Sequence, residues 1–301
     1  MHPALKQRLE IALSSSTASR ISRIRLTGKR LILAYHGIIP KGEQAAGERS
    51  LFVRQEQFAA QLDALRALVE VVPLDRLDEP ATDKPRVAIT FDDGYRGAVN
   101  EGVRELVDRG MPATIFVAPG RLDGHSFWWD ELSTGPSLNE SVRNHALFEL
   151  AGSDERVKSW AAASGLATCD KLPGYAQSAT LDELRDALTR PGITVGSHTW
   201  SHINLAASMP SEVVAEISQS RDWLRSEFGE KALPWLAYPY GFDSPEIHQA
   251  VANASYQGAV RIEGGWHNAS KVSPFARPRM NVPADLSLAG FRARIIGSLR
   301  T

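Results

Sequence analysis

Two adjacent carboxylates, Asp92 and Asp93, follow a short apolar segment and precede a glycine. The apolar residues 87–89 predict a buried strand. Side chains alternate between the two faces of a strand, so both aspartates reach one site only if the chain turns there, and Gly94 allows that turn. Two crowded carboxylates repel each other unless a cation or a shared proton lies between them. The pair therefore indicates a metal site whose other ligands come from elsewhere in the chain.

Two histidines four residues apart, His198 and His202, follow a second predicted strand at 193–196. A helical turn after this strand would place both imidazoles on one face. Two histidines and one carboxylate hold a zinc-type ion and leave a fourth position open for water, which is typical of a catalytic site. The histidine pair alone is a weak signal, because two polar residues on an exposed turn explain such a pair more often than a metal site does. Combined with the Asp-Asp-Gly strand end, it favours a metal site formed by Asp93, His198 and His202.

Three motifs in fixed order carry a family resemblance: Thr-Phe-Asp-Asp-Gly at 90–94, Ser-His-Thr-x-x-His at 197–202 and Tyr-Pro-Tyr-Gly at 238–241. They resemble the signature motifs of the polysaccharide deacetylases, carbohydrate esterase family 4, which includes the nodulation-type chitooligosaccharide deacetylases. The resemblance extends over about residues 31–282. It implies an α/β protein, a distorted (β/α) barrel of about seven strands, that binds one divalent ion and releases acetate from N-acetylated sugars. Zinc is the expected ion, with cobalt, nickel or manganese as alternatives.

The resemblance also implies catalytic roles. Asp92 would take a proton from the attacking water, and the backbone N–H of Tyr240 would donate to the oxyanion. Many relatives carry, at the position of Ala237, an arginine that orients the catalytic aspartate. We expect Arg279, in the Arg-Pro-Arg segment at 277–279, to pair with Asp92 instead, although Arg279 also fits a surface position.

The histidine that relatives carry in a Leu-x-His motif near the C-terminus is missing as well. His36 ends the first predicted strand, at 31–37, and barrel enzymes place their chemistry at that end of their strands. We therefore expect His36 to protonate the leaving amine, with a purely structural histidine as the alternative. His267 does not fit the missing motif, and we expect it to face solvent.

Residues 128–178 exceed what one crossover between strands requires, so we expect a largely helical insertion over the catalytic face. Its first residues, Trp128 and Trp129, either stack on a sugar ring or anchor the insertion to the barrel. We expect at least one of them to line the cleft, and Tyr238 and Tyr240 to contribute to substrate binding. Helical spacing of apolar residues predicts outer helices at 52–68, 95–109 and 211–228, the last with Val214 on its inner face.

The remaining chain suggests one barrel domain at 31–301, insertion included, preceded by an N-terminal helical extension at 1–30. The extension is basic and amphipathic and could lie on a partner or a membrane surface, or pack on the barrel. It lacks the apolar stretch of a signal peptide or a membrane span, which favours a cytoplasmic location. A net charge of −1 gives no general attraction to nucleic acid, and the single cysteine, Cys169, excludes an internal disulfide.

Together these patterns predict a metal-dependent N-deacetylase whose partner is an N-acetylated glycan: a polysaccharide, an oligosaccharide or a precursor in glycan assembly. Two other functions stay open. One is a metal-dependent hydrolase of a non-sugar amide or imide, because cyclic-imide amidases share this barrel. The other is a glycan-binding relative without catalysis, because Ala237 and the missing Leu-x-His motif depart from the family pattern.

Overall fold

The computed structural model describes Leu26 and residues 28–80, 84–135, 137–169 and 171–299. The strands in this part of the chain are β1 (Arg30–Tyr35), β2 (Gly37–Ile39), β3 (Phe52–Arg54), β4 (Glu70–Val71), β5 (Arg86–Phe91), β6 (Ala113–Val117), β7 (Ile193–Ser197), β8 (Ala232–Ala237), β9 (Gly258–Val260) and β10 (Met280–Asn281). Seven of them form a parallel sheet in the order β10-β1-β5-β6-β7-β8-β9, and β4 pairs with the start of β5. The expected fold, a distorted (β/α) barrel of about seven strands, is confirmed.

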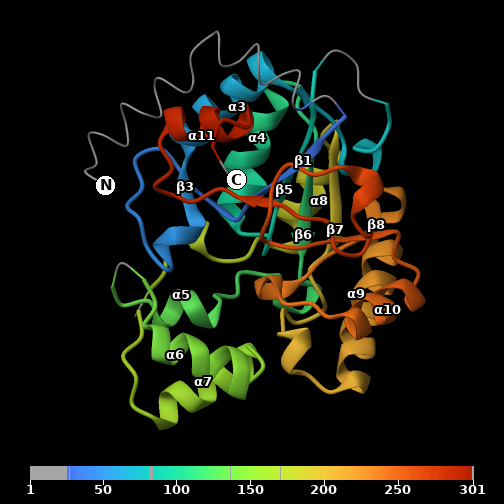
Figure 1. The fold of residues 1–301 in the computed structure, drawn as a ribbon. Coiled ribbons are helices and arrows are strands. Elements are labelled where there is room, and N and C mark those ends of the chain that lie inside the picture. Colours follow the sequence, from blue (N-terminus) through green and yellow to red (C-terminus); the bar gives the residue numbers. More distant parts are fainter. Residues whose placement is uncertain (1–25, 27, 81–83, 136, 170, 300–301) are drawn as a thin grey trace.

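Helices flank this sheet and continue beyond it (Figure 1). The α-helices are α3 (Gln55–Leu68), α4 (Val103–Val107), α5 (Trp128–Leu132), α6 (Glu140–Asn144), α7 (Asp154–Ala163), α8 (Leu181–Thr189), α9 (Pro210–Phe228), α10 (Pro245–Asn253) and α11 (Leu288–Ile295). Helices α5, α6 and α7 lie together, apart from the helices that flank the strands. They belong to the segment 128–178, which the sequence predicted to be largely helical.

Shorter helical turns connect these elements. They are η1 (Arg49–Leu51), η2 (Leu74–Arg76), η3 (Ala98–Gly102), η4 (Pro119–Arg121), η5 (His145–Glu149), η6 (Gly174–Ala176), η7 (Leu205–Ala207), η8 (Gly229–Lys231), η9 (Pro239–Gly241) and η10 (Ala269–Lys271). The helix expected at 95–109 is present only in part, because η3 is a π-helical turn and α4 is short. In α9 the prediction for Val214 is wrong: Val214 is exposed, and its neighbour Val213 is buried.

The alternation of side chains along β1 and β5 separates two cores. Leu31, Leu33 and Tyr35 belong to the large cluster that packs against the flanking helices, whereas Ile32 belongs to a smaller cluster with Ala88, Phe116, Trp235 and Ala237. That smaller cluster draws on five of the parallel strands and fills the inside of the curved sheet. On β5 the inward positions are therefore 88 and 90, and continuing the alternation makes Asp92 the next inward residue.

The segment 277–282 links the two edges of the curved sheet. Arg277 forms a parallel bridge with Val260 of β9, and its backbone exchanges hydrogen bonds of 2.8 and 3.0 Å with the same strand region. A few residues later, β10 pairs in parallel with β1, and the N–H of Val282 donates to the carbonyl of Ala34. Arg279 lies in this segment between the contact with β9 and the contact with β1, where the barrel closes.

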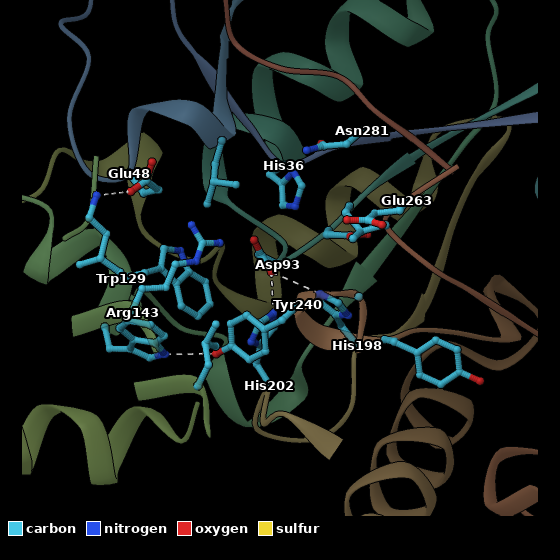
Figure 2. A pocket seen from close by; sticks show the side chains of 18 residues that line it. His36, Glu48, Asp93, Trp129, Arg143, His198, His202, Tyr240, Glu263 and Asn281 are labelled. Atoms are coloured by element: carbon cyan, nitrogen blue, oxygen red, sulfur yellow. Dashed lines mark hydrogen bonds and ion pairs between the residues drawn. The ribbon is translucent and has the colours of Figure 1, made fainter. Parts of the chain in front are cut away.

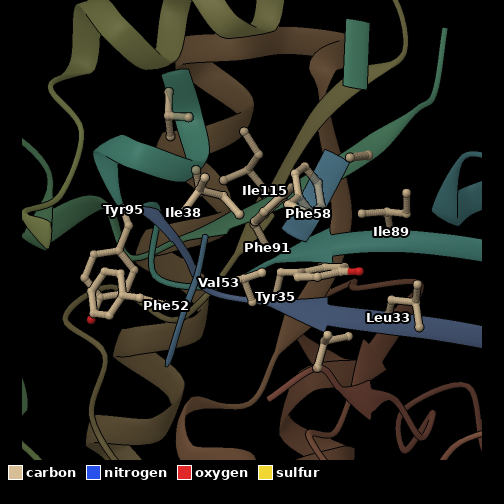
Figure 3. Packing of buried hydrophobic residues seen from close by; sticks show 14 of the residues in the cluster. Leu33, Tyr35, Ile38, Phe52, Val53, Phe58, Ile89, Phe91, Tyr95 and Ile115 are labelled. Atoms are coloured by element: carbon tan, nitrogen blue, oxygen red, sulfur yellow. The ribbon is translucent and has the colours of Figure 1, made fainter. Parts of the chain in front are cut away.

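An aromatic cluster fixes β1 and β5 against α3 (Figure 3). The ring of Phe58 is edge-on to Tyr35 at 5.0 Å and to Phe91 at 5.6 Å, and all three side chains are buried. The Tyr35 hydroxyl donates to Gln61 Oε1 at 3.0 Å, so the polar end of this ring is also satisfied. These contacts hold the strands whose ends carry His36 and Asp92.

No helix in the described ranges is both long and apolar enough to cross a membrane. The predicted N-terminal extension, with its amphipathic surface, lies almost wholly outside the described residues.

We predict that Phe58→Ala lowers the free energy of unfolding by about 3–5 kcal/mol, because it leaves a cavity between α3 and the sheet. Chemical denaturation measures this. The matched control is Phe148→Ala, because Phe148 is 53 % exposed and its loss should cost less than about 1 kcal/mol. Equal losses in the two variants would contradict the packing described here.

Candidate active site

Three side chains meet where β5 and β7 end. Asp93 Oδ1 lies 3.4 Å from His198 Nε2 and 3.0 Å from His202 Nε2, and all three residues are buried. Figure 2 shows both contacts converging on Asp93. One ligand atom from each residue lies within 4.8 Å of the others, so the group could hold a metal ion.

The donor set fits a divalent ion of the zinc type. Two ligands at 2.0–2.1 Å from a tetrahedral zinc ion are about 3.3 Å apart, close to the two separations given above. The Nδ1 atom of His198 is 2.7 Å from the carbonyl of Ala237. That contact fixes the ring so that Nε2 faces Asp93, as in metal sites whose histidines are oriented by a backbone carbonyl.

The chain brings Asp92 and Asp93 to one site by a turn that begins at Asp93 itself. Asp92 continues the inward side of β5, and regular alternation would send Asp93 outward. Instead Asp93 has φ of 67° and Gly94 has φ of 68°, both in the left-handed region. Aspartate tolerates this region better than most residues. The expected turn is present, and it involves the aspartate as well as the glycine.

The predicted helical turn between His198 and His202 is wrong. The segment from 198 to 204 is a loop, and Thr199 and His202 have φ of 63° and 64°. Glu216 on α9 holds this loop: its carboxylate accepts from the N–H groups of Trp200 and Ser201 at 2.9 and 2.8 Å. The histidines converge because of this tertiary contact, and helical spacing plays no part.

Asp92 forms a two-pronged ion pair with Arg279 inside the barrel. Arg279 Nη1 donates to Oδ1 at 2.7 Å and Nη2 to Oδ2 at 2.6 Å, and both residues are buried. The guanidinium also donates to Thr90 Oγ1 and to the carbonyl of Arg261, so its orientation is fixed. Burial is the largest influence and would raise the pKa of Asp92, but the charge and hydrogen bonds of Arg279, together with the charge of His198, hold that pKa below its ordinary value.

His36 follows β1 and lines the same pocket as the two aspartates. Burial lowers the pKa of its imidazole, and the charges of Asp93 and Asp92 only partly oppose this. His36 is therefore a neutral ring near pH 7, within the electrostatic reach of both carboxylates.

Tyr240 connects the third motif to the insertion. Its backbone lies in the left-handed region, with φ of 59° and ψ of 1°. Its hydroxyl is 3.0 Å from the carbonyl of Gly152 and 3.1 Å from Trp128 Nε1. A Cβ at Gly152 would come within 2.6 Å of the tyrosine ring, so only glycine leaves room for this contact.

The two tryptophans both border the pocket, and both anchor the insertion. Their stacking on a sugar ring stays a prediction. Trp128 donates to Gly152, as it does to Tyr240. The ring of Trp129 lies 4.8 Å from that of His202, and its Nε1 donates to the Tyr95 hydroxyl at 2.8 Å. Trp129 thus packs directly against one of the three metal-site side chains.

Behind Trp129 lies a fully buried carboxyl group, Asp130. The Tyr95 hydroxyl donates to its Oδ2 at 2.5 Å, and the N–H of Glu48 donates to its Oδ1 at 2.8 Å. Burial raises the pKa of Asp130 to about 8. The chain Asp130, Tyr95 and Trp129 therefore holds the indole against His202.

Tyr238 borders the pocket, but its side chain contacts the protein interior. Its hydroxyl donates to the carbonyl of Phe275 at 2.8 Å, and its ring packs in a cluster with Leu236 and Ile247. Its polar end is therefore not available to a sugar. The pocket itself measures about 270 Å³ and brings together Asp92, Asp93, His198, His202, His36, Tyr240 and both tryptophans.

Several site residues escaped the sequence analysis. Glu216 is a single acid with no motif around it, and Glu48 and Tyr95 contact partners that are distant in sequence. A charged residue directly after Trp128 and Trp129 was the one usable signal, because a carboxylate within a buried aromatic segment requires a partner. The expectation for His267 was wrong: this residue is buried and pairs through its backbone with Arg30.

The raised pKa of Asp130 predicts a pH-dependent stability. The folded protein keeps a proton on Asp130 up to about pH 8, whereas the unfolded chain releases it near pH 4. The free energy of unfolding therefore falls as pH rises through this interval, by at most about 1.4 kcal/mol per pH unit from this group. We predict that Asp130→Asn removes this component, measured by chemical denaturation at pH 5, 6, 7 and 8.

Glu183→Gln is the control for that measurement. Burial alone would raise the pKa of Glu183, but hydrogen bonds from Thr180 and Arg96 hold it below its ordinary value, so it stays ionised from pH 5 to 8. A difference between the wild type and Asp130→Asn that stays constant across these pH values would show that Asp130 is ionised in the folded protein.

Comparison with known proteins agrees with these features. Residues 79–259, which are 181 of the 301 residues, match the family model described as Polysaccharide deacetylase. Over 297 residues the chain is 24 % identical to YxkH of Bacillus subtilis (strain 168), whose name assigns it to the polysaccharide deacetylases. This match covers 96 % of the chain and 84 % of YxkH.

Two of the solved structures that share the fold illustrate the similarity. The Streptococcus pyogenes deacetylase PplD, in complex with acetate, matches with a TM-score of 0.62 and 19 % identity over 89 % of this chain and 98 % of PplD. IcaB from Ammonifex degensii matches with a TM-score of 0.59 and 18 % identity over 90 % of this chain and 98 % of IcaB. With the family match and the buried Asp-His-His group, the conclusion is that this chain belongs to the polysaccharide deacetylases, hydrolases that act on carbon–nitrogen bonds other than peptide bonds.

Proposed function

We propose that this protein is a metal-dependent N-deacetylase that hydrolyses the acetamido group of an N-acetylated sugar in a glycan. One observation carries the proposal: a buried Asp-His-His donor set adjoins a second carboxylate paired with an arginine, in one pocket. Hydrolysis of an unactivated amide requires an activated water, a proton acceptor and stabilisation of an oxyanion. The pocket supplies candidates for each requirement.

Asp93, His198 and His202 are the proposed metal ligands, with zinc the expected ion because the donors are nitrogen and oxygen atoms at tetrahedral separations. When bound, such an ion supplies Lewis acidity, which polarises an amide carbonyl and lowers the pKa of water. The contact of His198 Nδ1 with Ala237 and the packing of Trp129 on His202 orient the two rings for this task.

Asp92 is the proposed general base. It is one residue from Asp93, it lines the pocket, and its low pKa keeps it ionised at neutral pH, ready to accept a proton from water. Arg279 holds both carboxylate oxygens in place. The two neighbouring aspartates can both be charged because Arg279 neutralises one and the metal ion would neutralise the other.

Tyr240 and His36 complete the proposed machinery. The backbone N–H of Tyr240 would donate to the oxyanion, and the contacts of its side chain with Gly152 and Trp128 fix the turn that aims it. His36 would donate a proton to the leaving amine. Because burial keeps its imidazole neutral near pH 7, His36 must first gain a proton during the reaction, and Asp92, which would take that proton from water, is the proposed source.

Acetate release tests the proposal. Protein reconstituted with zinc, cobalt, nickel or manganese is incubated with free, polymeric and lipid-linked N-acetyl sugars, and acetate is measured. Release from a sugar that stops on chelation and returns with metal supports the proposal. Cleavage of a cyclic imide without acetate release from any sugar favours the non-sugar amidase, and glycan binding without metal or acetate favours a binding protein.

We predict that Asp92→Asn lowers turnover by about 10²–10⁴-fold, the usual contribution of a positioned proton acceptor, and leaves the metal content unchanged. Acetate release and elemental analysis of the same preparation measure both quantities. Loss of the metal would identify Asp92 as a ligand, and normal turnover would exclude it as the base.

We predict that Arg279→Met moves the acid limb of the kcat/KM profile to higher pH. Without the guanidinium, burial raises the pKa of Asp92, so a larger fraction is protonated and inactive at a given pH. The same substitution leaves a buried charge unpaired and costs about 3–5 kcal/mol of stability.

Arg279→Lys is the matched variant for that prediction. It retains the positive charge but loses the two-pronged geometry, so its acid limb should lie between those of the wild type and Arg279→Met. If the acid limb lies at the same pH in the wild type and in both variants, the ionisation of Asp92 does not determine the pH profile.

A further inference from the structure

Most of the charged side chains that line the catalytic pocket have a partner among the described residues of the protein, and two do not. Asp92 is paired with Arg279, and Asp93 lies against the two histidines. Glu48 accepts from Ser133 Oγ at 3.1 Å and from the N–H of Leu138 at 2.7 Å. Arg143 and Glu263 line the same pocket and, within the described part of the chain, have no side-chain hydrogen bond or ion pair.

Arg143 is the only lysine or arginine among the described residues that line this pocket. It belongs to α6 of the insertion, and Leu138 and Leu147, on either side of it in the sequence, line the same cavity. In Figure 2 it lies on the side of Trp129 and Glu48, with Glu263 and Asn281 on the other side. Its positive charge acts on the Tyr240 hydroxyl, where it opposes the effect of burial on the pKa of that group.

Three other cations in and next to the insertion are each paired with an acid. Arg121 pairs with Asp154 at 2.9 Å, Arg156 with Glu212 at 3.0 Å, and Lys158 with Glu131 at 2.8 Å. The side chain of Arg143 instead stays exposed beside the catalytic groups. An arginine on the wall of a substrate pocket, with no acid to neutralise it, is available to a ligand.

The geometry points to Arg143 as an anion subsite: we propose that the natural substrate is an N-acetylated glycan that carries a carboxylate or a phosphate close to the acetamido group. The planar guanidinium matches both anions through two parallel hydrogen bonds. Arg143 and Trp129 line the same pocket and lie on the same side of it in Figure 2, so a sugar bound in the pocket against Trp129 could direct a charged substituent to Arg143. This proposal rests on the deacetylase function proposed above.

The test compares three N-acetylglucosamine oligosaccharides of similar length: a neutral one, one in which the sugar alternates with a uronic acid, and one that carries a phosphomonoester. Acetate release gives kcat and KM for each. We expect the wild type to prefer one of the two anionic substrates, which identifies the anion. In Arg143→Gln the ratio of kcat/KM for anionic over neutral substrate should fall about tenfold or more, mainly through KM.

Arg143→Lys and Arg156→Gln are the matched variants. Lysine keeps the positive charge but cannot form two parallel hydrogen bonds to one anion. The ratio of kcat/KM for anionic over neutral substrate in Arg143→Lys should therefore lie between those of the wild type and Arg143→Gln. Arg156 is an exposed arginine of the same insertion that pairs with Glu212, so its removal should leave the ratio unchanged. Added salt should weaken the anionic preference of the wild type and of Arg156→Gln alike.

A binding measurement separates this proposal from the deacetylase function. Calorimetry with Asp92→Asn protein should show that the preferred anionic oligosaccharide binds about tenfold more weakly when Arg143→Gln is added. If that holds while no sugar loses acetate, the subsite stands and the deacetylase function falls. If acetate is released but the wild type treats all three substrates alike, or Arg143→Gln weakens the neutral one equally, the subsite is refuted and the deacetylase function stands.

Discussion

The buried pairing of Asp92 with Arg279 is the interaction on which the rest of the site depends. Two neighbouring carboxylates cannot both remain ionised in a dry pocket without separate counter-charges. Arg279 satisfies one of them through both oxygens, which leaves Asp93 free to face the two imidazoles. Without this division of charge, the two aspartates would share a proton, and neither could serve the role proposed for it.

The barrel is arranged so that this pair can form. Ala237 and Ala88 are small residues on the inside of the sheet, and Gly196 leaves room for the ring of Phe116. The guanidinium of Arg279 lies 5.8 Å from the centre of that ring. Small side chains on the central strands thus leave room for a long side chain from the closing segment. Position 237, where many relatives are expected to carry an arginine, is an alanine here, and the guanidinium that pairs with Asp92 comes from Arg279 in the closing segment.

The sequence was sufficient to predict that Asp93, His198 and His202 meet in one place, but not the local geometry that brings them there. The Asp-Asp-Gly strand end, the histidine pair and the barrel follow from residue types, periodicity and family motifs. The left-handed backbone at Thr199 and His202 does not, because Glu216 imposes it from a distant helix. The Asp130–Tyr95–Trp129 chain has the same origin: each link joins residues that only the folded chain brings together. Propensity describes neighbours in sequence, and these contacts are long-range.

Residues of the segment 128–178, the predicted insertion, form part of the pocket wall. Its turn at Ala151 and Gly152 accepts a hydrogen bond from Asn204 in the histidine loop and contacts the hydroxyl of Tyr240. One short stretch of the insertion therefore touches both the loop that carries His202 and the turn that carries Tyr240. Any shift of this stretch would move two groups of the proposed machinery together.

The position of Arg279 in the closing segment also has a consequence for biosynthesis. A ribosome makes Asp92, Asp93 and both histidines before it makes Arg279, and β10 completes the sheet after all the other strands have been translated. A nascent polypeptide that still lacks this segment has every metal donor but no counterion for Asp92, which would then take up a proton on burial. If Asp92 is the general base proposed above, the protein could hydrolyse an amide only after the segment that carries Arg279 has docked and closed the barrel.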